Sequence, residues 1–263
     1  MVSPSNLQPK PNSGDLIRLI LLIVGVGGVF GVLFILVALG ATPAGATAAR
    51  GLSSFLALDT VQAGWYVTRA AGLLAYLLTW WSTVWGLGLA SRIFHPAVEG
   101  AQSYDFHEFV SLLALAFMLL HVGVLMLDRF LPFTLAQLLI PFISKYRPAW
   151  VGLGVIGLYT FTLVTVTFYL RRFIGTQAFR SIHVLSLIGY AGVTLHGLFA
   201  GTDSGLPAAK FMYSGTFLGV VFLLVYWLVM NAHAKRVRVE AAETRLVAQA
   251  QRSGSSRTRR RAA

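Results

Sequence analysis

The stretch HEFVSLLALAFMLLH (His107–His121) decides how the rest of the chain is interpreted. Its two terminal histidines enclose thirteen residues that are almost all apolar or small. A second stretch, HVLSLIGYAGVTLH (His183–His196), repeats the pattern with twelve residues between its histidines. Each run is long enough to form most of a membrane-spanning helix. Ionisable side chains at that depth are costly and usually functional, so the four histidines are the leading candidates for a site.

The composition places the chain among integral membrane proteins. Of its 263 residues, 56% are hydrophobic and only 11% are charged. There is no cysteine, which excludes c-type haem attachment, iron–sulfur clusters, Cys-bound zinc and disulfides. The net charge of +12 could suggest nucleic acid, but much of it lies in the last thirty residues. Beside a membrane segment, such a cluster is more typical of contact with anionic lipid, so we predict membrane lipid and no nucleic acid as partners.

Apolar runs of about 20 residues recur along the chain, the length that crosses a bilayer. The prediction is an all-α bundle of six transmembrane helices: Leu16–Leu39, Val67–Ala90, Phe106–Leu127, Trp150–Leu170, Ile182–Ala200 and Phe211–Met230. A cleaved signal peptide is the alternative for the first of these. Its apolar run is longer than a signal core, so we favour an uncleaved helix.

The remaining segments complete the expected organisation. Residues 1–15 form a polar N-terminus, residues 16–233 the six-span domain, and residues 234–263 a basic tail that begins as a helix and ends disordered. The segment Arg129–Pro148 is too short and too rich in proline to cross, which predicts an amphipathic segment at the interface. With both termini on one side, that side holds 15 of the 21 Lys and Arg residues. We therefore predict a multi-pass cell-membrane protein with both termini cytoplasmic.

The spacing of the first histidine pair suggests what it binds. Over fourteen residues a helix rises ~21 Å and returns to within ~40° of its starting direction, so His107 and His121 leave one face at two depths. Two of the residues on the face between them, Ser111 and Ala114, are small and leave room for a flat macrocycle. The third and fifth spans run parallel, which sets His107 level with His183, and His121 level with His196. The sequence thus predicts two b-type haems, each with two axial histidines that ligate its iron.

The second pair fits less well. Thirteen residues leave His183 and His196 ~140° apart on an ideal helix, so a bulge or bend must realign them. Gly189 and Gly192 would ease such a distortion and would also make room for a ring. If the strained helix cannot offer both imidazoles, the protein retains one haem.

The propionates of haem need cationic partners near each membrane surface. Candidates inside are Arg92, Arg171, Arg172 and Arg180; candidates outside are Arg69, Arg129, Lys145 and Arg147. Arg69 is the most informative, because it lies just inside the outer end of the second span. It either faces the outer haem or serves as a snorkelling anchor at the interface.

With these histidines in view, the chain resembles the ferric reductase-like transmembrane family. That family includes the membrane domains of ferric reductases and NADPH oxidases and the haem subunit of bacterial methionine sulfoxide reductase systems. Eukaryotic members carry H-x13-H on the third helix and H-x12-H on the fifth, as His107/His121 and His183/His196 do here. The stretches Thr68–Leu78 and Asp128–Gly154 look like bacterial members, and the resemblance covers about residues 64–232.

The resemblance implies transmembrane electron transfer, with an oxidoreductase as the expected class. In the oxidases an arginine near the outer end of the second helix borders the outer haem, and Arg69 matches it by position. The sequence shows no Rossmann-type glycine loop, so the expected electron donor is a separate flavoprotein or quinol. The acceptor on the outer side stays open.

Two alternatives from other classes remain at this point. Four intramembrane histidines could line a proton or metal-ion pathway in a transporter without haem. However, Asp105, Glu108 and Asp128 all sit at helix ends, and no clear inverted repeat is present. The chain could also be an anchor on whose tail a soluble partner docks.

Overall fold

The computed structural model describes residues 47, 63–91, 93, 101–128 and 131–261. The predicted first span, Leu16–Leu39, and the polar residues 1–15 lie outside this part of the chain. Within it, every regular element is an α-helix. The helices are α3 (Ala63–Ser91), α4 (Ala101–Leu127), α5 (Leu135–Leu139), α6 (Pro148–Ile174), α7 (Thr176–His183), α8 (Leu185–Ala200) and α9 (Pro207–Arg261).

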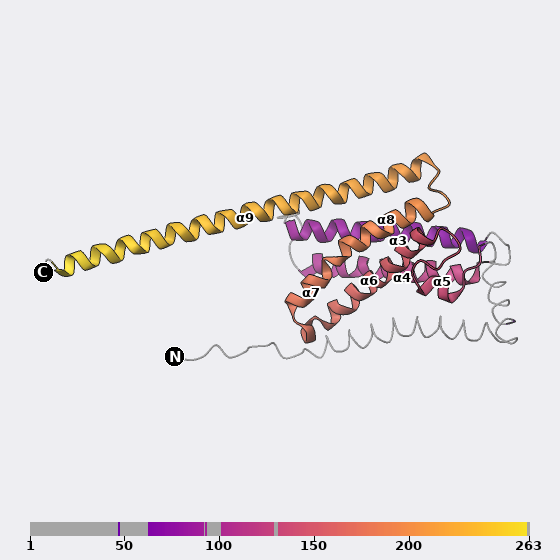
Figure 1. Ribbon diagram of the computed structural model, residues 1–263, viewed down its shortest axis with the longest axis horizontal. Coiled ribbons are helices and arrows are strands. Elements are labelled where there is room, and N and C mark those ends of the chain that lie inside the picture. Colours follow the sequence, from indigo (N-terminus) through magenta and orange to yellow (C-terminus); the bar gives the residue numbers. More distant parts are fainter. Residues whose placement is uncertain (1–46, 48–62, 92, 94–100, 129–130, 262–263) are drawn as a thin grey trace.

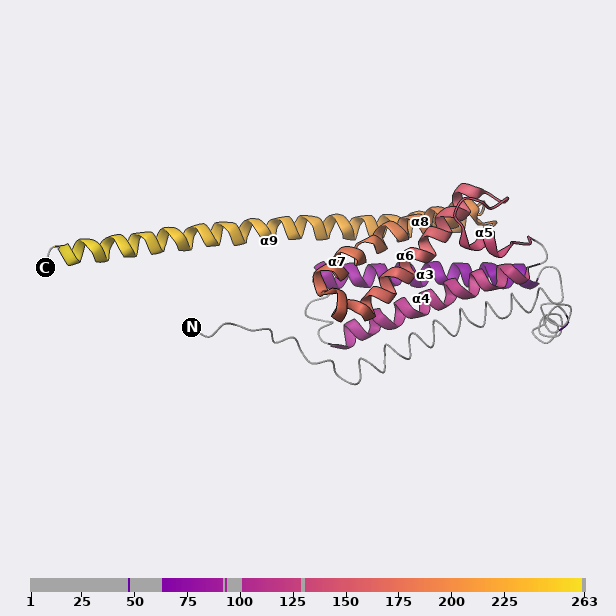
Figure 2. The same ribbon diagram turned by 60° about the horizontal axis from the view of Figure 1, so that its bottom comes forward.

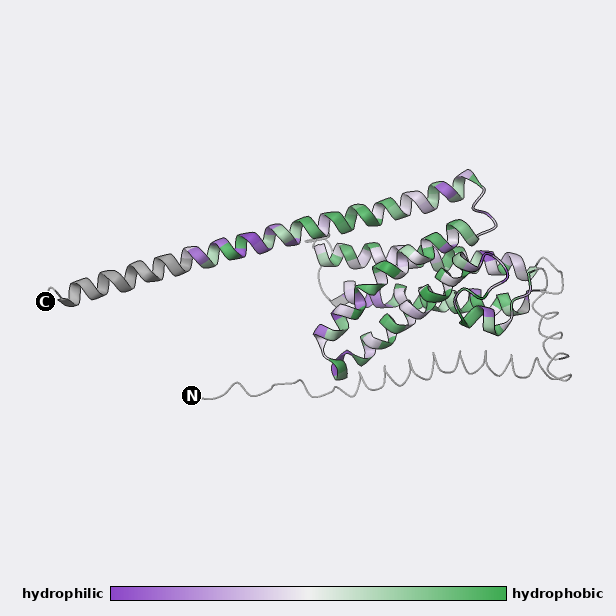
Figure 3. Ribbon diagram, in the orientation of Figure 1, coloured by the Kyte–Doolittle hydropathy of each residue, from purple (hydrophilic) through white to green (hydrophobic). Residues whose placement is uncertain are grey.

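Five helical segments in the described part are long and apolar enough to cross a bilayer, so the chain is a multi-pass membrane protein. They are α3, α4, α6, α7 with α8, and α9. These correspond to the second to sixth predicted spans, which are confirmed as helices. Each begins a few residues earlier than predicted, because hydropathy marks only the part within the hydrocarbon, whereas a helix continues into the interface (Figure 3).

The long helices of the described part lie side by side (Figures 1 and 2). α3 packs mainly on α4, and α6 mainly on α8, while α9 lies against α3 and α8. Two apolar clusters hold these contacts together. One joins α3, α4 and α6 through Ala75, Leu115, Met118, Leu119 and Leu158, and the other joins α3, α8 and α9 through Tyr76, Leu87, Tyr190, Tyr213 and Val220.

The segment between α4 and α6 does not cross the bundle, as predicted. Its helix, α5, has five residues and is held by a capping box between Thr134 and Gln137. Downstream of α5, the apolar side chains of Ile140, Phe142 and Ile143 are each about half exposed. Exposed apolar groups beside a short helix fit a segment that rests in the membrane interface.

The predicted distortion of the fifth span is present, but its position differs from the prediction. The helix is interrupted at Val184, so that α7 ends at His183 and α8 begins at Leu185. A tighter turn follows, in which the Leu187 N–H donates to the Val184 carbonyl at 3.1 Å. Gly189, where a bend was expected, lies inside α8. A Cβ there would come within 3.0 Å of Thr160 Cγ2, so this glycine lets α8 pack closely on α6 instead.

The prediction of a disordered end to the basic tail is wrong for the described residues. α9 continues as one helix of 55 residues to Arg261 and projects far beyond the bundle (Figure 1). At 1.5 Å per residue it is ~80 Å long, more than twice a hydrocarbon core. Ala, Glu, Gln, Leu and Arg dominate residues 240–252, and these strong helix formers extend the transmembrane helix into water.

Candidate functional site

The four histidines of the two stretches meet in space as two pairs. The ring centroids of His107 and His183 are 6.2 Å apart, and those of His121 and His196 are 6.3 Å apart. The ring planes cross at 78° in both pairs. The pairing predicted from parallel helices is thus confirmed. We call His107/His183 the inner pair and His121/His196 the outer pair, after the predicted orientation.

The spacing of each pair suits one shared metal atom. An imidazole nitrogen binds a metal at ~2 Å and lies ~1 Å from its ring centroid, so two axial imidazoles on one iron place their centroids ~6 Å apart. Both pairs have this separation. Among the described residues, no group of three or more His, Cys, Asp or Glu side chains could hold a metal ion. Two imidazoles at this separation could hold a metal whose other ligands come from a macrocycle.

Backbone carbonyls orient both rings of the outer pair. Nδ1 of His121 lies 2.8 Å from the carbonyl oxygen of Thr68, and Nδ1 of His196 lies 2.9 Å from that of Trp150. A carbonyl can only accept, so each Nδ1 carries the proton and donates it. Nε2 is then the unprotonated nitrogen of each ring, with its lone pair available to a metal. These two hydrogen bonds fix the tautomer and the orientation of each imidazole ring.

A glycine opens the way to each of these carbonyls. Gly72 comes four residues after Thr68, and Gly154 comes four residues after Trp150, one helical turn further in both cases. A Cβ on Gly72 would lie 2.9 Å from Nδ1 of His121, and one on Gly154 would lie 2.7 Å from Nδ1 of His196. Any side chain at either position would therefore push the imidazole away from its carbonyl.

The inner pair has only part of this support. Gly86, four residues after Ser82, faces His107, where a Cβ would come within 3.1 Å of Cε1. Nδ1 of His107 is 3.4 Å from the Ser82 hydroxyl, a long contact. On α6 the position fourteen residues after Gly154 is Phe168, not glycine. Nδ1 of His183 is buried and has no hydrogen-bond partner among the described residues.

Each pair opens into a cavity of its own. The outer cavity has a volume of ≈ 210 Å³ and the inner one ≈ 180 Å³. Thr79 and Met118 line both, so the cavities meet at mid-bundle. Ser111 and Ala114, predicted to leave room beside the first helix, line the inner cavity. The two cavities follow one another along the helices, as the depths of the histidines require.

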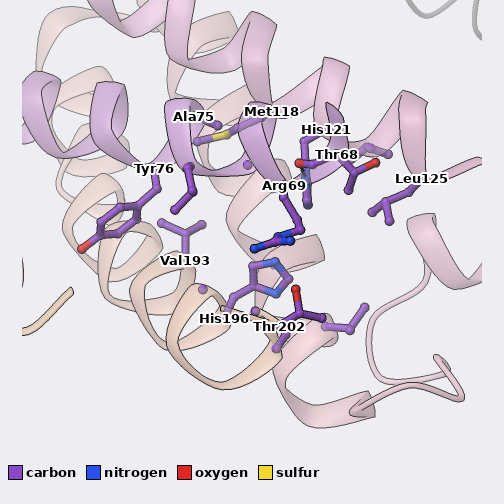
Figure 4. A pocket seen from close by; sticks show the side chains of 18 of the residues that line it. Thr68, Arg69, Ala75, Tyr76, Met118, His121, Leu125, Val193, His196 and Thr202 are labelled. Carbon is purple, nitrogen blue, oxygen red and sulfur yellow. Dashed lines mark hydrogen bonds between the residues drawn. The ribbon is translucent and has the colours of Figure 1, made fainter. Parts of the chain in front are cut away.

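Arg69 borders the outer cavity, as the sequence suggested (Figure 4). Its Nε donates to Asp203 Oδ2 at 2.6 Å, and the two side chains form an ion pair. Its guanidinium also lies 4.0 Å from the centroid of the Trp65 ring. Figure 4 shows Arg69 among the side chains that line the outer cavity, together with His121 and His196. Sequence reasoning missed Asp203, for which the polar loop GTDSG (Gly201–Gly205), separated by four residues from the second histidine stretch, was the available signal.

Arg172 is the cation that stands out at the inner end of α6. Its Nε and Nη1 atoms are buried and have no hydrogen-bond partner among the described residues. Arg172 lies one helical turn beyond Phe168 and two turns beyond Thr165 on α6. Thr165 lines the inner cavity. A buried guanidinium of this kind calls for an anion. If haem b is bound here, the paired imidazoles would hold it and Arg172 would be available to a propionate.

Other residues considered from sequence have ordinary surroundings. His233 is exposed on α9, and His95 lies outside the described residues. Tyr190 is 1% exposed, and its hydroxyl is 3.2 Å from that of Tyr76, so it packs α8 on α3. Glu108 accepts a hydrogen bond from the Tyr169 hydroxyl at 2.5 Å, which joins α4 to α6 beside the inner pair.

Comparisons with protein-family models, with curated proteins and with solved structures find no match for this chain.

Proposed function

We propose that this membrane protein is a dihaem b-type cytochrome that passes electrons across the bilayer. The observation that carries the proposal is the equal geometry of the two histidine pairs, with centroids 6.2 and 6.3 Å apart and ring planes at 78° in both. Two unrelated packing histidines would have no reason to share a spacing with a second pair fourteen and thirteen residues away. A spacing of ~6 Å in both pairs supports one iron between each.

The chain's own residues have separate tasks in this proposal. Haem supplies one-electron chemistry when it is bound. The four imidazoles would hold the irons at two depths, and the carbonyls of Thr68 and Trp150 keep the outer rings in the tautomer that leaves Nε2 unprotonated. Apolar side chains around both cavities exclude water, which sets the potentials through burial.

The functional class that we propose rests on this arrangement and on the resemblance to ferric reductase-like membrane domains. We propose an oxidoreductase subunit that receives electrons at the inner pair from a flavoprotein or quinol and delivers them to an acceptor at the outer pair. Both termini are cytoplasmic in this proposal, so that the basic half of α9 lies on the donor side.

Electron transfer across a sealed membrane tests the function separately from haem binding. The purified full chain is reconstituted in liposomes that contain ferricyanide, and an impermeant reductant is added outside. We expect the protein to accelerate reduction of the trapped ferricyanide, and His121→Ala and His183→Ala each to abolish the acceleration, because both depths are needed. A wild-type protein that binds haem but leaves the internal ferricyanide oxidised would contradict the proposal.

A further inference from the structure

Two buried side chains lie where the outer and inner cavities meet. Thr79 on α3 and Met118 on α4 line both cavities, and within the described part of the chain no other residue is shared by the two linings. Figure 4 shows Met118 among the side chains of the outer cavity. Both residues are buried, so they belong to the interior of the bundle and not to its surface. They therefore mark the boundary between the two proposed haem sites.

The helical register places both residues on the faces that carry or meet the histidines. Thr79 is seven residues from Gly72 and seven from Gly86 on α3, and seven residues return a helix to within ~20° of its starting direction. Met118 follows His107 by eleven residues, also within ~20° of its direction, and precedes the outer histidine of α4 by three residues, or ~4.5 Å. Each residue thus lies between the two depths on its own helix.

Of the two, Met118 is better suited to fill the space between the cavities. The Thr79 hydroxyl donates to the Ala75 carbonyl at 2.7 Å, so it is bound to its own helix. Met118 belongs to the apolar cluster that also contains Ala75, Leu115 and Leu119. A thioether on three rotatable bonds is polarisable and fills irregular gaps in a core.

We propose that the Met118 side chain fills the space between the two haem sites and is the contact through which electrons pass from the inner haem to the outer one. The inference rests on the proposed function. In the step concerned, one electron leaves ferrous iron at the inner pair and reduces ferric iron at the outer pair, and no bond or proton changes place. An electron crosses closely packed atoms faster than a void, so the filling of this gap controls the rate.

The aromatic side chains near the boundary offer a less direct path. Tyr76 lines only the outer cavity, and Phe161 lines only the inner one. Tyr190 lines neither cavity, and its hydroxyl is 3.2 Å from that of Tyr76. A path through these rings would need more than one side chain, whereas Met118 alone borders both sites.

A thiol placed at this position tests the location without measuring electron transfer. The chain has no cysteine, so Met118→Cys introduces a single thiol. With both haems bound we expect this thiol to resist N-ethylmaleimide, and we expect it to react when either cavity is emptied by His107→Ala or by His121→Ala. Leu119→Cys is the matched control, because Leu119 is buried in the same cluster but lines neither cavity, and it should stay unreactive throughout. Reaction in only one histidine background would place Met118 in a single site and overturn the proposal.

The role is tested by single-turnover electron transfer to trapped ferricyanide in liposomes, started by flash reduction of an impermeant flavin outside. Met118→Ala should slow the transfer several-fold, because it leaves a void at the boundary. Met118→Leu nearly conserves the volume and should keep the wild-type rate. Leu119→Ala makes a similar void away from both cavities and should also keep it. Haem content and both midpoint potentials, measured in each variant, separate lost haem or a changed driving force from a lost contact.

Three results would overturn the proposal. The first is an unchanged rate in Met118→Ala with both haems present. The second is equal slowing in Leu119→Ala, which would reduce the effect to a general loosening of the core. The third is a loss in Met118→Leu as large as in Met118→Ala, since a filled gap would then not be sufficient. A failure of the proposed function would differ from all three, because the wild-type chain itself would carry no haem or leave the ferricyanide oxidised.

Discussion

The outer and inner histidine pairs have the same spacing and ring angle but different support. Both outer rings donate to backbone carbonyls at 2.8 and 2.9 Å, and a glycine on the next turn makes each contact possible. The inner pair has one such glycine, a 3.4 Å contact from His107 to the Ser82 hydroxyl, and no partner for Nδ1 of His183. The comparison teaches that one bundle can place two pairs alike and orient them unequally.

The difference has a local cause in the sequence. Gly72 and Gly86 are fourteen residues apart on α3, the same interval as His107 and His121 on α4. On α6 the interval from Gly154 leads to Phe168, whose ring packs against that of Phe179 on α7. The helix carrying His183 is also interrupted at Val184. We therefore expect the outer site to hold its haem more tightly than the inner site.

Removal of a ligand should have the largest effect. His121→Ala and His196→Ala should each remove the outer haem and leave the inner one, and His107→Ala and His183→Ala should do the reverse, because each haem would lose one of the two imidazoles that hold it. Absorbance of the dithionite-reduced protein should fall to about half in each case. His233→Ala, at an exposed position on α9, is the matched control and should keep full absorbance.

Substitution of the glycines that face the histidine rings should have the second largest effect. Gly154→Ala places a methyl group 2.7 Å from Nδ1 of His196, so the ring must move and its bond to the Trp150 carbonyl is lost. A buried donor without a partner costs ~1–3 kcal/mol, which corresponds to an about 5- to 150-fold loss of affinity for the outer haem. The rate at which haem is transferred from the protein to apomyoglobin measures this loss of affinity.

Two further glycine substitutions serve as comparisons for Gly154→Ala: one faces the inner histidine pair, and one lies where an added methyl group meets no other atom. Gly86→Ala, with its methyl 3.1 Å from Cε1 of His107, should cause a smaller loss at the inner haem. Gly219→Ala meets nothing within 4 Å and should leave both haems in place. Equal losses of the outer haem in Gly154→Ala and Gly219→Ala would show that the space at Gly154 has no role in holding it.

Removal of the Asp203 charge should have a moderate effect confined to the outer site. Asp203 pairs with Arg69 beside the outer cavity, and both side chains are about a quarter exposed. A nearby anion favours the oxidised iron, so Asp203→Asn should raise the outer potential by tens of millivolts, with partial screening by salt. Potentiometric titration should show the inner potential unchanged; a downward shift at the outer haem would be the wrong sign for this account.

Loss of the Ser82 hydroxyl should have the smallest effect. Its contact with His107 Nδ1 is 3.4 Å long, and it is also 2.7 Å from the Ser111 hydroxyl. Ser82→Ala should weaken retention of the inner haem by less than ~1 kcal/mol, because the bond that it removes is weak. The apomyoglobin assay applies here too. A loss as large as that of Gly154→Ala would mean that the inner ring depends on this hydroxyl after all.

Much of the bundle and of the histidine pairing could be predicted from sequence. Apolar runs gave the described spans, and the fourteen-residue interval on α4 gave two depths on one face. The position of the break at Val184 could not, because no glycine or proline marks it in the sequence. The Arg69–Asp203 pair joins residues 134 apart, which no local pattern connects. The glycines that face the histidines did leave a periodic signal, the fourteen-residue interval between Gly72 and Gly86. Glycine is common in membrane helices and has several uses, so this interval alone does not predict a contact with histidine.

The most direct test of the account is the haem content of the full chain. The protein is purified in mild detergent from haem-sufficient cells, and haem b is measured as the pyridine haemochrome against chain concentration from amino-acid analysis. The account predicts two haems for each chain. A folded preparation that carries none would contradict it.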